Sequence, residues 1–356
     1  MKTILVIVIL LLTSVLETFP QGNLCKEEVS VQEINNLLFK GDKYWRGADG
    51  AASIDLGKNK ILWLFGDTFI DTLGTGKRTN STLIRNSIAI QNGEDIDSSS
   101  LIFYYRGISK KPRAFFELPG DNWFWTGHGT VVKDKLIIFL FELERTNEGF
   151  GFQSVGWHMA VVKNPSDDPL NWDIEYFKGP YPAGILLGSS AVLKDDQFVY
   201  AYGVKEPGSH EVYLLRFEID QLLVGNFSSM AWWSNKRWVN NTGFAPENSV
   251  LFTGHTEFSV HYQKEIESYM QIQSFGFGHA ELGYRLAAQP QGPWSEPVIF
   301  YKPVYADEQE FMYSARAHPE LTSNGVLVTF NVNSFDFGKL VRNEEIYFPR
   351  IIKLEF

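Results

Sequence analysis

Residues 49–65 read DGAASIDLGKNKILWLF, and this stretch decides the predicted fold. Small and polar residues come first, a turn follows at 57–59, and the chain returns through the apolar run ILWLF at 61–65. Turn-forming Gly and Asn between two strand-forming runs are typical of a β-hairpin. The stretch therefore predicts two antiparallel strands, of which the second is buried.

Four more stretches repeat this pattern of a short strand, a polar turn and an apolar or aromatic return strand. They are HGTVVKDKLIIFLF at 128–141, SSAVLKDDQFVYAY at 189–202, EFSVHYQKEIESYMQI at 257–272 and RAHPELTSNGVLVTFN at 316–331. The turns recur at intervals of roughly 60 to 75 residues, which is enough for four strands in each unit. Further apolar strands are predicted after several hairpins, at 157–162, 212–217 and 282–287.

We therefore predict an all-β fold, a five-bladed β-propeller formed by a single domain at 23–356. Helical periodicity is limited to one or two turns at Val29–Leu38, and the final segment, 347–356, is predicted to be a strand that helps to close the ring. The competing fold is a pair of β-sandwiches, which has the same strand content but gives no reason for five similar hairpins.

The composition excludes several classes of protein. The chain has 356 residues, 44% of them hydrophobic, and a formal net charge of -10, so it lacks the cationic surface of a general nucleic-acid binder. Its one cysteine, Cys25, cannot form an internal disulfide or a thiolate zinc site. We predict no cofactor and no metal ligands. A calcium ion held in the channel by Asp, Asn and carbonyl oxygens stays an open alternative that no spacing identifies.

The first 22 residues are predicted to be a secretory signal peptide. Lys2 precedes an apolar run at 4–12 that is too short to span a bilayer comfortably. A retained membrane anchor is the alternative, and lipid attachment at Cys25 is disfavoured because Leu24 stands where a small residue is expected. We expect a secreted monomer, extracellular or periplasmic, with no membrane contact after cleavage. Three glycosylation sequons, at Asn80, Asn226 and Asn240, matter only in a eukaryotic source.

Two carboxylates are predicted to face each other at one end of the first hairpin. Asp49 and Asp67 are equally far from Lys58, the centre of the turn, so in a regular hairpin they lie on directly opposed positions. Carboxylates that close cannot ionise independently, and one pKa rises. Glycoside hydrolysis uses such a pair. The alternative is that both are turn residues bonded to their own backbone.

The same end of the propeller collects further polar and aromatic side chains. The predicted substrate-binding residues are His128, Trp123, Trp125, Glu257, Arg316 and His318. The two tryptophans offer flat faces for a sugar ring, and Glu257 would be a third carboxylate. Arg316 would donate to a substrate hydroxyl or to a catalytic carboxylate. The alternatives are a solvated turn for His128, core packing for the tryptophans, an exposed edge for Glu257, an ion pair for Arg316 and a structural role for His318.

The sequence around the two aspartates resembles a known family. GADG at 47–50 followed by LWLFGDTF at 62–69 is similar to the opening blade of the domain of unknown function 4185, a group that includes glycoside hydrolase family 183. The resemblance implies a five-bladed propeller, endo-acting hydrolysis of D-arabinofuranan, and a catalytic pair at Asp49 and Asp67. The first blade is more loosely similar to that of glycoside hydrolase families 43, 32 and 68.

We therefore expect a secreted glycoside hydrolase that acts on a plant or microbial polysaccharide, with an arabinofuranan-like substrate implied by the resemblance. Two other functions stay open. The protein could bind carbohydrate without cleaving it, through the tryptophans alone, or it could be a scaffold that binds protein loops. Only hydrolysis requires both carboxylates to lie close together.

Overall fold

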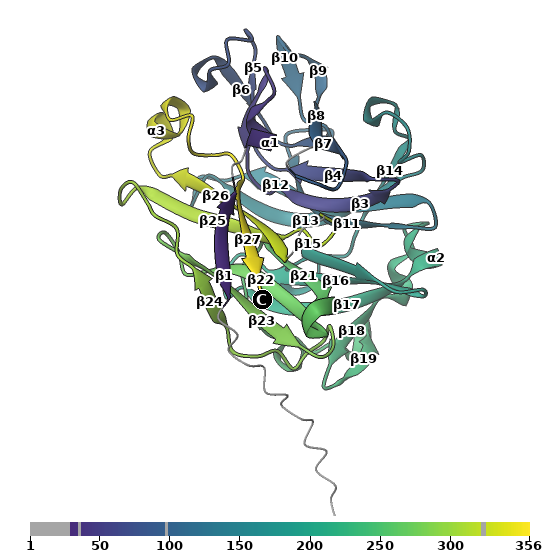
Figure 1. The fold of residues 1–356 in the computed structure, drawn as a ribbon. Helices are drawn as coiled ribbons and strands as arrows, with labels where there is room; N and C mark the ends of the chain where they lie inside the picture. Colours follow the sequence, from purple (N-terminus) through teal and green to yellow (C-terminus); the bar gives the residue numbers. More distant parts are fainter. Residues whose placement is uncertain (1–28, 35–36, 97–98, 322–324) are drawn as a thin grey trace, which may run out of the picture.

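The computed structural model describes residues 29–34, 37–96, 99–321 and 325–356, so the predicted signal peptide at 1–22 lies outside the described residues. Figure 1 shows the main sheets arranged around a common centre. Each of them is antiparallel, and its strands follow one another outward from the innermost strand, except that the outer strand of the last sheet comes from the N-terminal part of the chain. These sheets are the five blades of a β-propeller, and the predicted fold is confirmed. Five separate radial sheets also exclude the pair of β-sandwiches.

The first three blades contain most of the N-terminal half of the chain. Blade 1 consists of β3 (Ala52–Gly57), β4 (Lys60–Phe65), β7 (Ser87–Asn92) and β8 (Ser100–Tyr104). Blade 2 consists of β11 (Trp123–Val132), β12 (Lys135–Arg145), β13 (Phe152–Val162) and β14 (Ile174–Lys178). Blade 3 consists of β15 (Ile185–Lys194), β16 (Phe198–Lys205), β17 (Glu211–Glu218), β18 (Ala231–Ser234) and β19 (Arg237–Asn240), with β20 (Phe252–Thr253) beside β17.

The last two blades complete the ring. Blade 4 consists of β21 (Phe258–Gln263), β22 (Ser268–Phe275), β23 (Glu281–Ala287) and β24 (Val298–Tyr301). Blade 5 consists of β25 (Glu310–Ala317), β26 (Val326–Ser334), β27 (Arg350–Glu355) and β1 (Ser30–Ile34). All five predicted hairpins form the first two strands of a blade, and the predicted strands at 157–162, 212–217 and 282–287 lie in the third strands β13, β17 and β23.

Two small sheets, three short helices and several 3₁₀ turns are described outside the five blades. A three-stranded sheet contains β2 (Trp45–Ala48), β5 (Thr68–Asp71) and β6 (Ser81–Ile84), and a hairpin contains β9 (Arg106–Ile108) and β10 (Lys111–Arg113). The helices are α1 (Leu37–Lys40), α2 (Ile219–Leu222) and α3 (Phe337–Arg342). Single 3₁₀ turns are η1 (Arg78–Asn80), η2 (Pro169–Asn171), η3 (Pro182–Gly184), η4 (Phe227–Ser229), η5 (Asn241–Gly243), η6 (Pro246–Asn248) and η7 (Lys264–Ile266). In the described part of the chain, no helix has the length and apolar character needed to cross a membrane.

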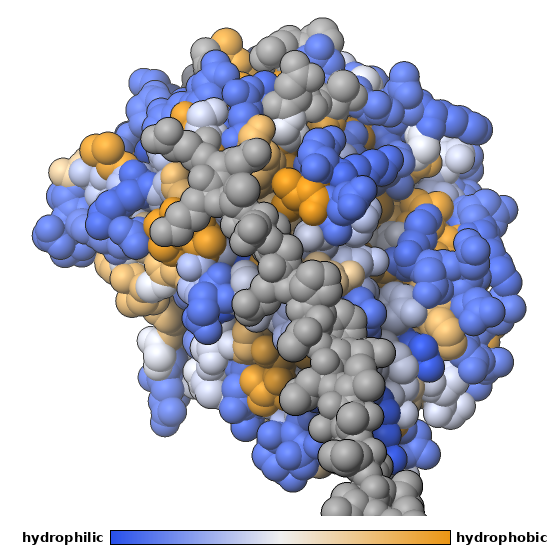
Figure 2. Space-filling view, turned by 60° about the horizontal axis from the view of Figure 1, so that its bottom comes forward, coloured by the Kyte–Doolittle hydropathy of each residue, from blue (hydrophilic) through white to orange (hydrophobic). Residues whose placement is uncertain are grey.

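The hydrophobic core lies between neighbouring blades. Leu62 and Leu64 of β4 pack in one cluster with Ile138 and Leu140 of β12, because a blade is covered by a sheet on each side. This is why the return strands are apolar along their whole length, as in the run at 61–65, which is completely buried. On the face shown in Figure 2, hydrophilic residues predominate and hydrophobic residues form separate patches.

The ring is closed by pairing between the two ends of the chain. β1 runs antiparallel to β27, with Val31 opposite Leu354, so the N-terminal strand becomes the outer strand of the C-terminal blade. The prediction that the final segment helps to close the ring is confirmed. The prediction of helical turns at Val29–Leu38 is mostly wrong, because only α1 is helical there and Ser30–Ile34 is a strand. The open edge of β27 offers hydrogen bonds that override the local helical pattern.

A chain that begins at Leu37 lacks β1 and is expected to melt at least about 5 °C below a chain that begins at Val29, because the strand pairing and the packing of Val31 are lost. Thermal unfolding followed by circular dichroism measures the difference. Equal melting temperatures would show that pairing of β1 with β27 does not stabilise the ring.

Candidate functional site

Asp49 and Asp67 lie where two strand ladders meet. Ala52 pairs with Leu64 in the β3–β4 ladder, and Ala48 pairs with Thr68 in the β2–β5 ladder. The two ladders share one register, so Asp49 stands opposite Asp67 at the junction, where the amide of Gly66 donates to the main-chain oxygen of Asp49 at 2.9 Å.

The backbone around the pair permits this close approach. A Cβ atom on Gly66 would lie 2.5 Å from Asp49 Oδ1, so a larger residue here would displace the carboxylate from its position. On the other strand, Gly50 and Ala51 adopt φ angles of +89° and +49° as the chain turns into β3. Left-handed conformations at non-glycine residues cost energy and often occur at functional sites.

Among the described residues, Asp49 has two tyrosine partners and no cation within ion-pairing distance. The hydroxyl of Tyr313 donates to Asp49 Oδ2 at 2.6 Å. The hydroxyl of Tyr347 lies 3.1 Å from the same oxygen and 2.9 Å from the main-chain oxygen of Asp67, and its one hydrogen serves either acceptor. Burial, then the negative charges of Asp67 and Glu257, raise the pKa of Asp49 to about 8, although the tyrosine hydrogen bonds act to lower it.

Asp67 has a cation and an indole as partners. The Arg85 guanidinium lies 3.1 Å from Asp67 Oδ2, and the indole N–H of Trp125 donates to Oδ1 at 2.9 Å. Burial raises the pKa of Asp67, and Arg85 and Trp125 act against this rise. Because the cation lies beside Asp67, the proton shared by this pair belongs on Asp49, and the negative charge belongs on Asp67.

The two predicted tryptophans both lie on the Asp67 side of the site. The guanidinium of Arg85 sits 4.3 Å from the ring centre of Trp123, so this indole supports the cation that pairs with Asp67. Trp125 contacts Asp67 directly. The structure thus brings Trp125 to the carboxylate pair, whereas Trp123 is buried in a core cluster beneath Arg85, as the core-packing alternative predicts.

Glu257 lies near the pair, whereas Arg316 is turned into the channel. The side chain of Glu257 is 23% exposed and lies 3.7 Å from Arg316. Its charge contributes to the raised pKa of Asp49. The buried Arg316 guanidinium donates to the main-chain oxygens of Ser190, Phe258 and Ser189 at 2.5, 3.0 and 3.0 Å. Arg316 therefore joins blades 3, 4 and 5 through main-chain oxygens, and its contacts are not those predicted for a substrate-binding residue.

His128 and His318 lie deeper in the channel. His128 Nδ1 accepts from the amide of Val192 at 3.0 Å, so its Nε2 carries the proton and donates to the oxygen of Ser53 at 3.1 Å. Burial lowers the pKa of His128 to about 4. His318 bonds the hydroxyls of Ser53 and Thr329 at 2.5 and 2.7 Å, and burial lowers its pKa to about 3. Both rings are neutral and have both nitrogens engaged within the protein, unlike the ligand contacts expected from the sequence.

Tyr313, Tyr347 and Arg85 are parts of the site that the sequence pattern did not indicate. Tyr313 lies three residues before Arg316, upstream of the fifth predicted hairpin, and Tyr347 lies just before β27. Tyr347 adopts a φ angle of +65°. The contacts of both tyrosines with Asp49 form only when the last blade closes against the first, so no local pattern reveals them.

Arg78 fixes the segment that carries Tyr347. This arginine is 1% exposed. Its guanidinium donates to the main-chain oxygens of Leu340, Asn343 and Ile346 at 2.6, 2.9 and 2.8 Å. The last of these is the residue before Tyr347. A buried cation held by several carbonyls allows little movement, so Arg78 determines where the Tyr347 hydroxyl lies.

The family of the chain follows from a match over nearly its whole length. The model of the family DUF5005, a domain of unknown function, matches residues 32–355. The chain belongs to the DUF5005 family. The membership expected from the first blade, in the domain of unknown function 4185, is not confirmed. A search of curated proteins found no match.

Solved structures similar to this DUF5005 member share its fold. A Bacteroides ovatus protein described as a candidate hydrolase is 17% identical, with a TM-score of 0.75 over 92% of this chain and 90% of that one. The RS223 β-xylosidase is 11% identical, with a TM-score of 0.52 over 91% of this chain and 94% of that one. A xylan β-1,4-xylosidase from Bacillus halodurans is 8% identical, with a TM-score of 0.50 over 88% of this chain and 53% of that one.

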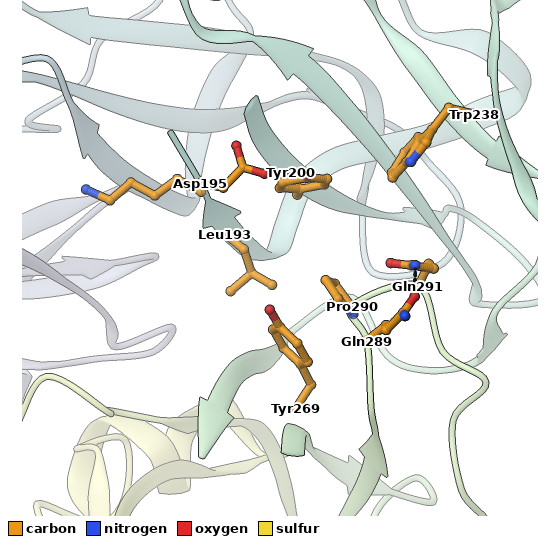
Figure 3. Close-up of a pocket in the computed structure, with 9 residues that line it drawn as sticks. Leu193, Asp195, Tyr200, Trp238, Tyr269, Gln289, Pro290 and Gln291 are labelled. Carbon is orange, nitrogen blue, oxygen red and sulfur yellow. Dashed lines mark hydrogen bonds between the residues drawn. The ribbon is translucent and has the colours of Figure 1, made fainter. Parts of the chain in front are cut away.

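A separate pocket of about 290 Å³ lies between blades 3 and 4 (Figure 3). Tyr200, Trp238 and Tyr269 form its aromatic walls, and Gln289 and Gln291 lie beside them. This pocket adjoins the end of β15, whereas Asp49 precedes the start of β3, so the two sites lie at opposite ends of the inner strands. Within the described ranges, no group of three or more His, Cys, Asp or Glu side chains is placed to hold a metal ion.

Asp49→Asn is expected to raise the melting temperature increasingly as the pH rises from about 4 to about 8, with the full gain above that range. The unfolded chain releases the Asp49 proton near its ordinary pKa, whereas the folded chain keeps it until about 8, so the wild type loses stability across this window. Thermal melts at pH 5, 7 and 9 measure the trend.

Asp71→Asn is the matched control, and it is expected to lower the melting temperature at neutral pH instead of raising it. Burial acts to raise the pKa of Asp71, but hydrogen bonds from Leu73, Gly76 and Thr75 lower it overall, so its stabilisation is present at neutral pH and is lost in acid. A melting temperature for Asp49→Asn that stays at the wild-type value at pH 9 would contradict the raised pKa.

Proposed function

We propose that this DUF5005 member is an exported glycoside hydrolase in which Asp49 donates a proton and Asp67 acts as the ionised carboxylate. The observation that carries this proposal is the asymmetry of the pair. Two opposed carboxyl groups at one end of the channel differ in their described partners, because Asp67 pairs with Arg85 and Asp49 accepts from two tyrosine hydroxyls. When the surroundings of two titratable groups give them different pKa values, the group with the higher pKa can serve as the acid and the other as the base.

The reaction follows from these two protonation states. The Asp49 carboxyl group transfers its proton to the glycosidic oxygen as the bond from that oxygen to the anomeric carbon breaks. The Asp67 carboxylate either removes a proton from the attacking water or attacks the anomeric carbon itself, and water then releases the sugar. Proton NMR of the first sugar anomer released distinguishes the two routes. In the first route, Asp67 takes up the water proton, and exchange with solvent then returns Asp49 to its protonated form and Asp67 to its ionised form. In the second route, Asp49 takes the proton from the water that cleaves the glycosyl–Asp67 ester.

The fold and the first-blade sequence support the substrate class. Two solved structures with a similar fold are a xylan β-1,4-xylosidase and another β-xylosidase, so propellers of this type can carry glycosidases. The resemblance of 47–50 and 62–69 to arabinofuranan-cleaving propellers makes an arabinofuranan-like polysaccharide the first substrate to try. Export rests on the segment at 1–22, whose removal would release the propeller outside the cytoplasm.

Asp49→Asn and Asp67→Asn are each expected to lower the release of reducing sugar by at least about a hundredfold, because positioned acid–base groups contribute roughly 10²–10⁴ in rate. Wild type and variants are compared on arabinofuranan, arabinan, xylan, galactan and levan. Asp220→Asn, which removes an exposed carboxylate paired with Lys133, is the control and keeps wild-type activity.

Equal release by wild type and both active-site variants would exclude this pair. Binding of a polysaccharide without any release would favour a non-catalytic carbohydrate-binding propeller. Failure to bind any of the five polysaccharides would favour the scaffold function.

The pH profile of kcat/KM is expected to fall above about pH 8, where Asp49 loses its proton. Tyr313→Phe removes a hydrogen bond that lowers the pKa of Asp49, so the alkaline limb is expected to move to higher pH. Tyr284→Phe, at a buried position of blade 4, leaves the profile unchanged. An alkaline limb that stays in place in Tyr313→Phe would contradict the assignment of that limb to Asp49.

A further inference from the structure

Four phenylalanines are strongly exposed in the part of the chain that the structure describes. Phe150 is 72% exposed, Phe277 74%, Phe335 46% and Phe337 59%. Phe150 lies between β12 and β13, Phe277 between β22 and β23, and the other two follow β26. These positions are at the end of the inner strands where Asp49 and Asp67 lie. Phenylalanine is normally buried, so four exposed rings gathered at one end of a propeller indicate a binding surface.

A row of aromatic rings leads outward from Asp49. We call this the Tyr313 row, and its members are Tyr313, Phe311, Phe335 and Phe277. Tyr313 bonds Asp49 and lies 5.5 Å, between ring centres, from Phe311. Phe311 stacks on Phe335 with 4.4 Å between ring centres, and Phe335 lies 5.9 Å from the exposed ring of Phe277.

A second row leads outward from Asp67. We call this the Trp125 row, and its members are Trp125, Phe152 and Phe150. Trp125 bonds Asp67, Phe152 packs edge-on against it at 4.7 Å, and Phe150 stacks on Phe152 at 6.3 Å. The two rows therefore start at different carboxylates of one pair and end in exposed rings.

The fourth exposed ring is also connected to the pair. Phe337 lies 6.4 Å from Phe69, and Phe69 lies 5.5 Å from Tyr347, whose hydroxyl contacts Asp49. Thus each exposed phenylalanine of the described residues is linked by ring contacts to a side chain that touches Asp49 or Asp67. Continuity of this kind is not expected of apolar residues left at a surface by chance.

We propose that the two rows bind one neutral glycan chain that passes over the Asp49–Asp67 pair, with sugar residues on the Tyr313 row on one side and on the Trp125 row on the other. This inference rests on the proposed function for the site between the rows. Aromatic faces suit the C–H faces of sugar rings, while the sugar hydroxyls stay in water. The net charge of -10 opposes a polyanionic glycan.

A glycan fits this surface better than an apolar protein segment does. Each row is short, and the two are separated by charged and polar groups, namely the aspartates, Arg85 and Glu257. A continuous apolar partner would bury these groups without hydrogen bonds, at a cost in free energy. A sugar chain offers hydroxyls to them and C–H faces to the rings.

Affinity electrophoresis in native gels that contain arabinan, arabinofuranan, xylan, galactan or levan tests the proposal. Wild type is expected to be retarded by at least one of these. In that gel, the double variant Phe277→Ala/Phe335→Ala is expected to bind about tenfold more weakly, and Phe150→Ala about threefold to tenfold more weakly. Thermal melts confirm that the variants fold, which the exposure of these side chains makes the expected result.

Two controls locate the binding. Tyr262→Ala removes an exposed aromatic ring at the other end of blade 4 and leaves retardation unchanged. Trp238→Ala alters the pocket of Figure 3 and is also expected to leave it unchanged. Loss of retardation in Trp238→Ala with none in the phenylalanine variants would overturn the proposal, as would a wild type that migrates freely in every gel.

Failure of this proposal and failure of the proposed function have different signatures. If wild type binds through the rows but releases no sugar, the proposed glycan surface is supported and the proposed hydrolysis is contradicted. If Asp49→Asn abolishes hydrolysis while the phenylalanine variants keep the wild-type KM for the polysaccharide, the proposed hydrolysis is supported and the proposed glycan surface is contradicted. Asp49→Asn itself is expected to stay retarded in the gel.

Discussion

The inner strands of the propeller have no strand neighbour on the channel side, and their polar groups need partners from elsewhere. Arg316 meets this need for Ser189, Ser190 and Phe258, and His128 meets it for Ser53 and Val192. The hydrogen-bonding groups of these side chains are engaged in contacts that hold neighbouring blades together. The two carboxylates at the end of the channel differ in their surroundings. Burial and nearby negative charges raise the pKa of Asp49, whereas Arg85 and Trp125 act against the rise in the pKa of Asp67.

Much of the fold could be read from the sequence because each hairpin is local. Apolar return strands and polar turns show directly in 49–65, and the equal distance of Asp49 and Asp67 from Lys58 holds because two ladders share one register. The strand β1 could not be predicted in the same way, since the strand it pairs with, β27, lies more than 300 positions later in the sequence. Local periodicity there suggested a helix.

Side-chain directions in the channel were harder to predict than strand positions. β11 contains a register shift between Thr126 and Gly129, and β25 contains one between Tyr313 and Arg316. Such bulges reset the alternation of side chains along a strand, so counting from the hairpin no longer tells which face a residue occupies. This is why His128 and Arg316 turn toward main-chain partners. Trp123 and Trp125 precede the bulge in β11. Trp125 bonds Asp67, and Trp123 packs against the Arg85 guanidinium that pairs with Asp67.

The dependence of Tyr347 on Arg78 has a consequence for biogenesis. The oxygens of Leu340, Asn343 and Ile346 that hold Arg78 belong to the fifth blade, which is synthesised after the segment that contains Asp49 and Asp67. A nascent or unfolded chain has both aspartates but neither tyrosine in place. The raised pKa of Asp49 comes chiefly from burial, so it is acquired only after the fifth blade has been made and has packed against the first.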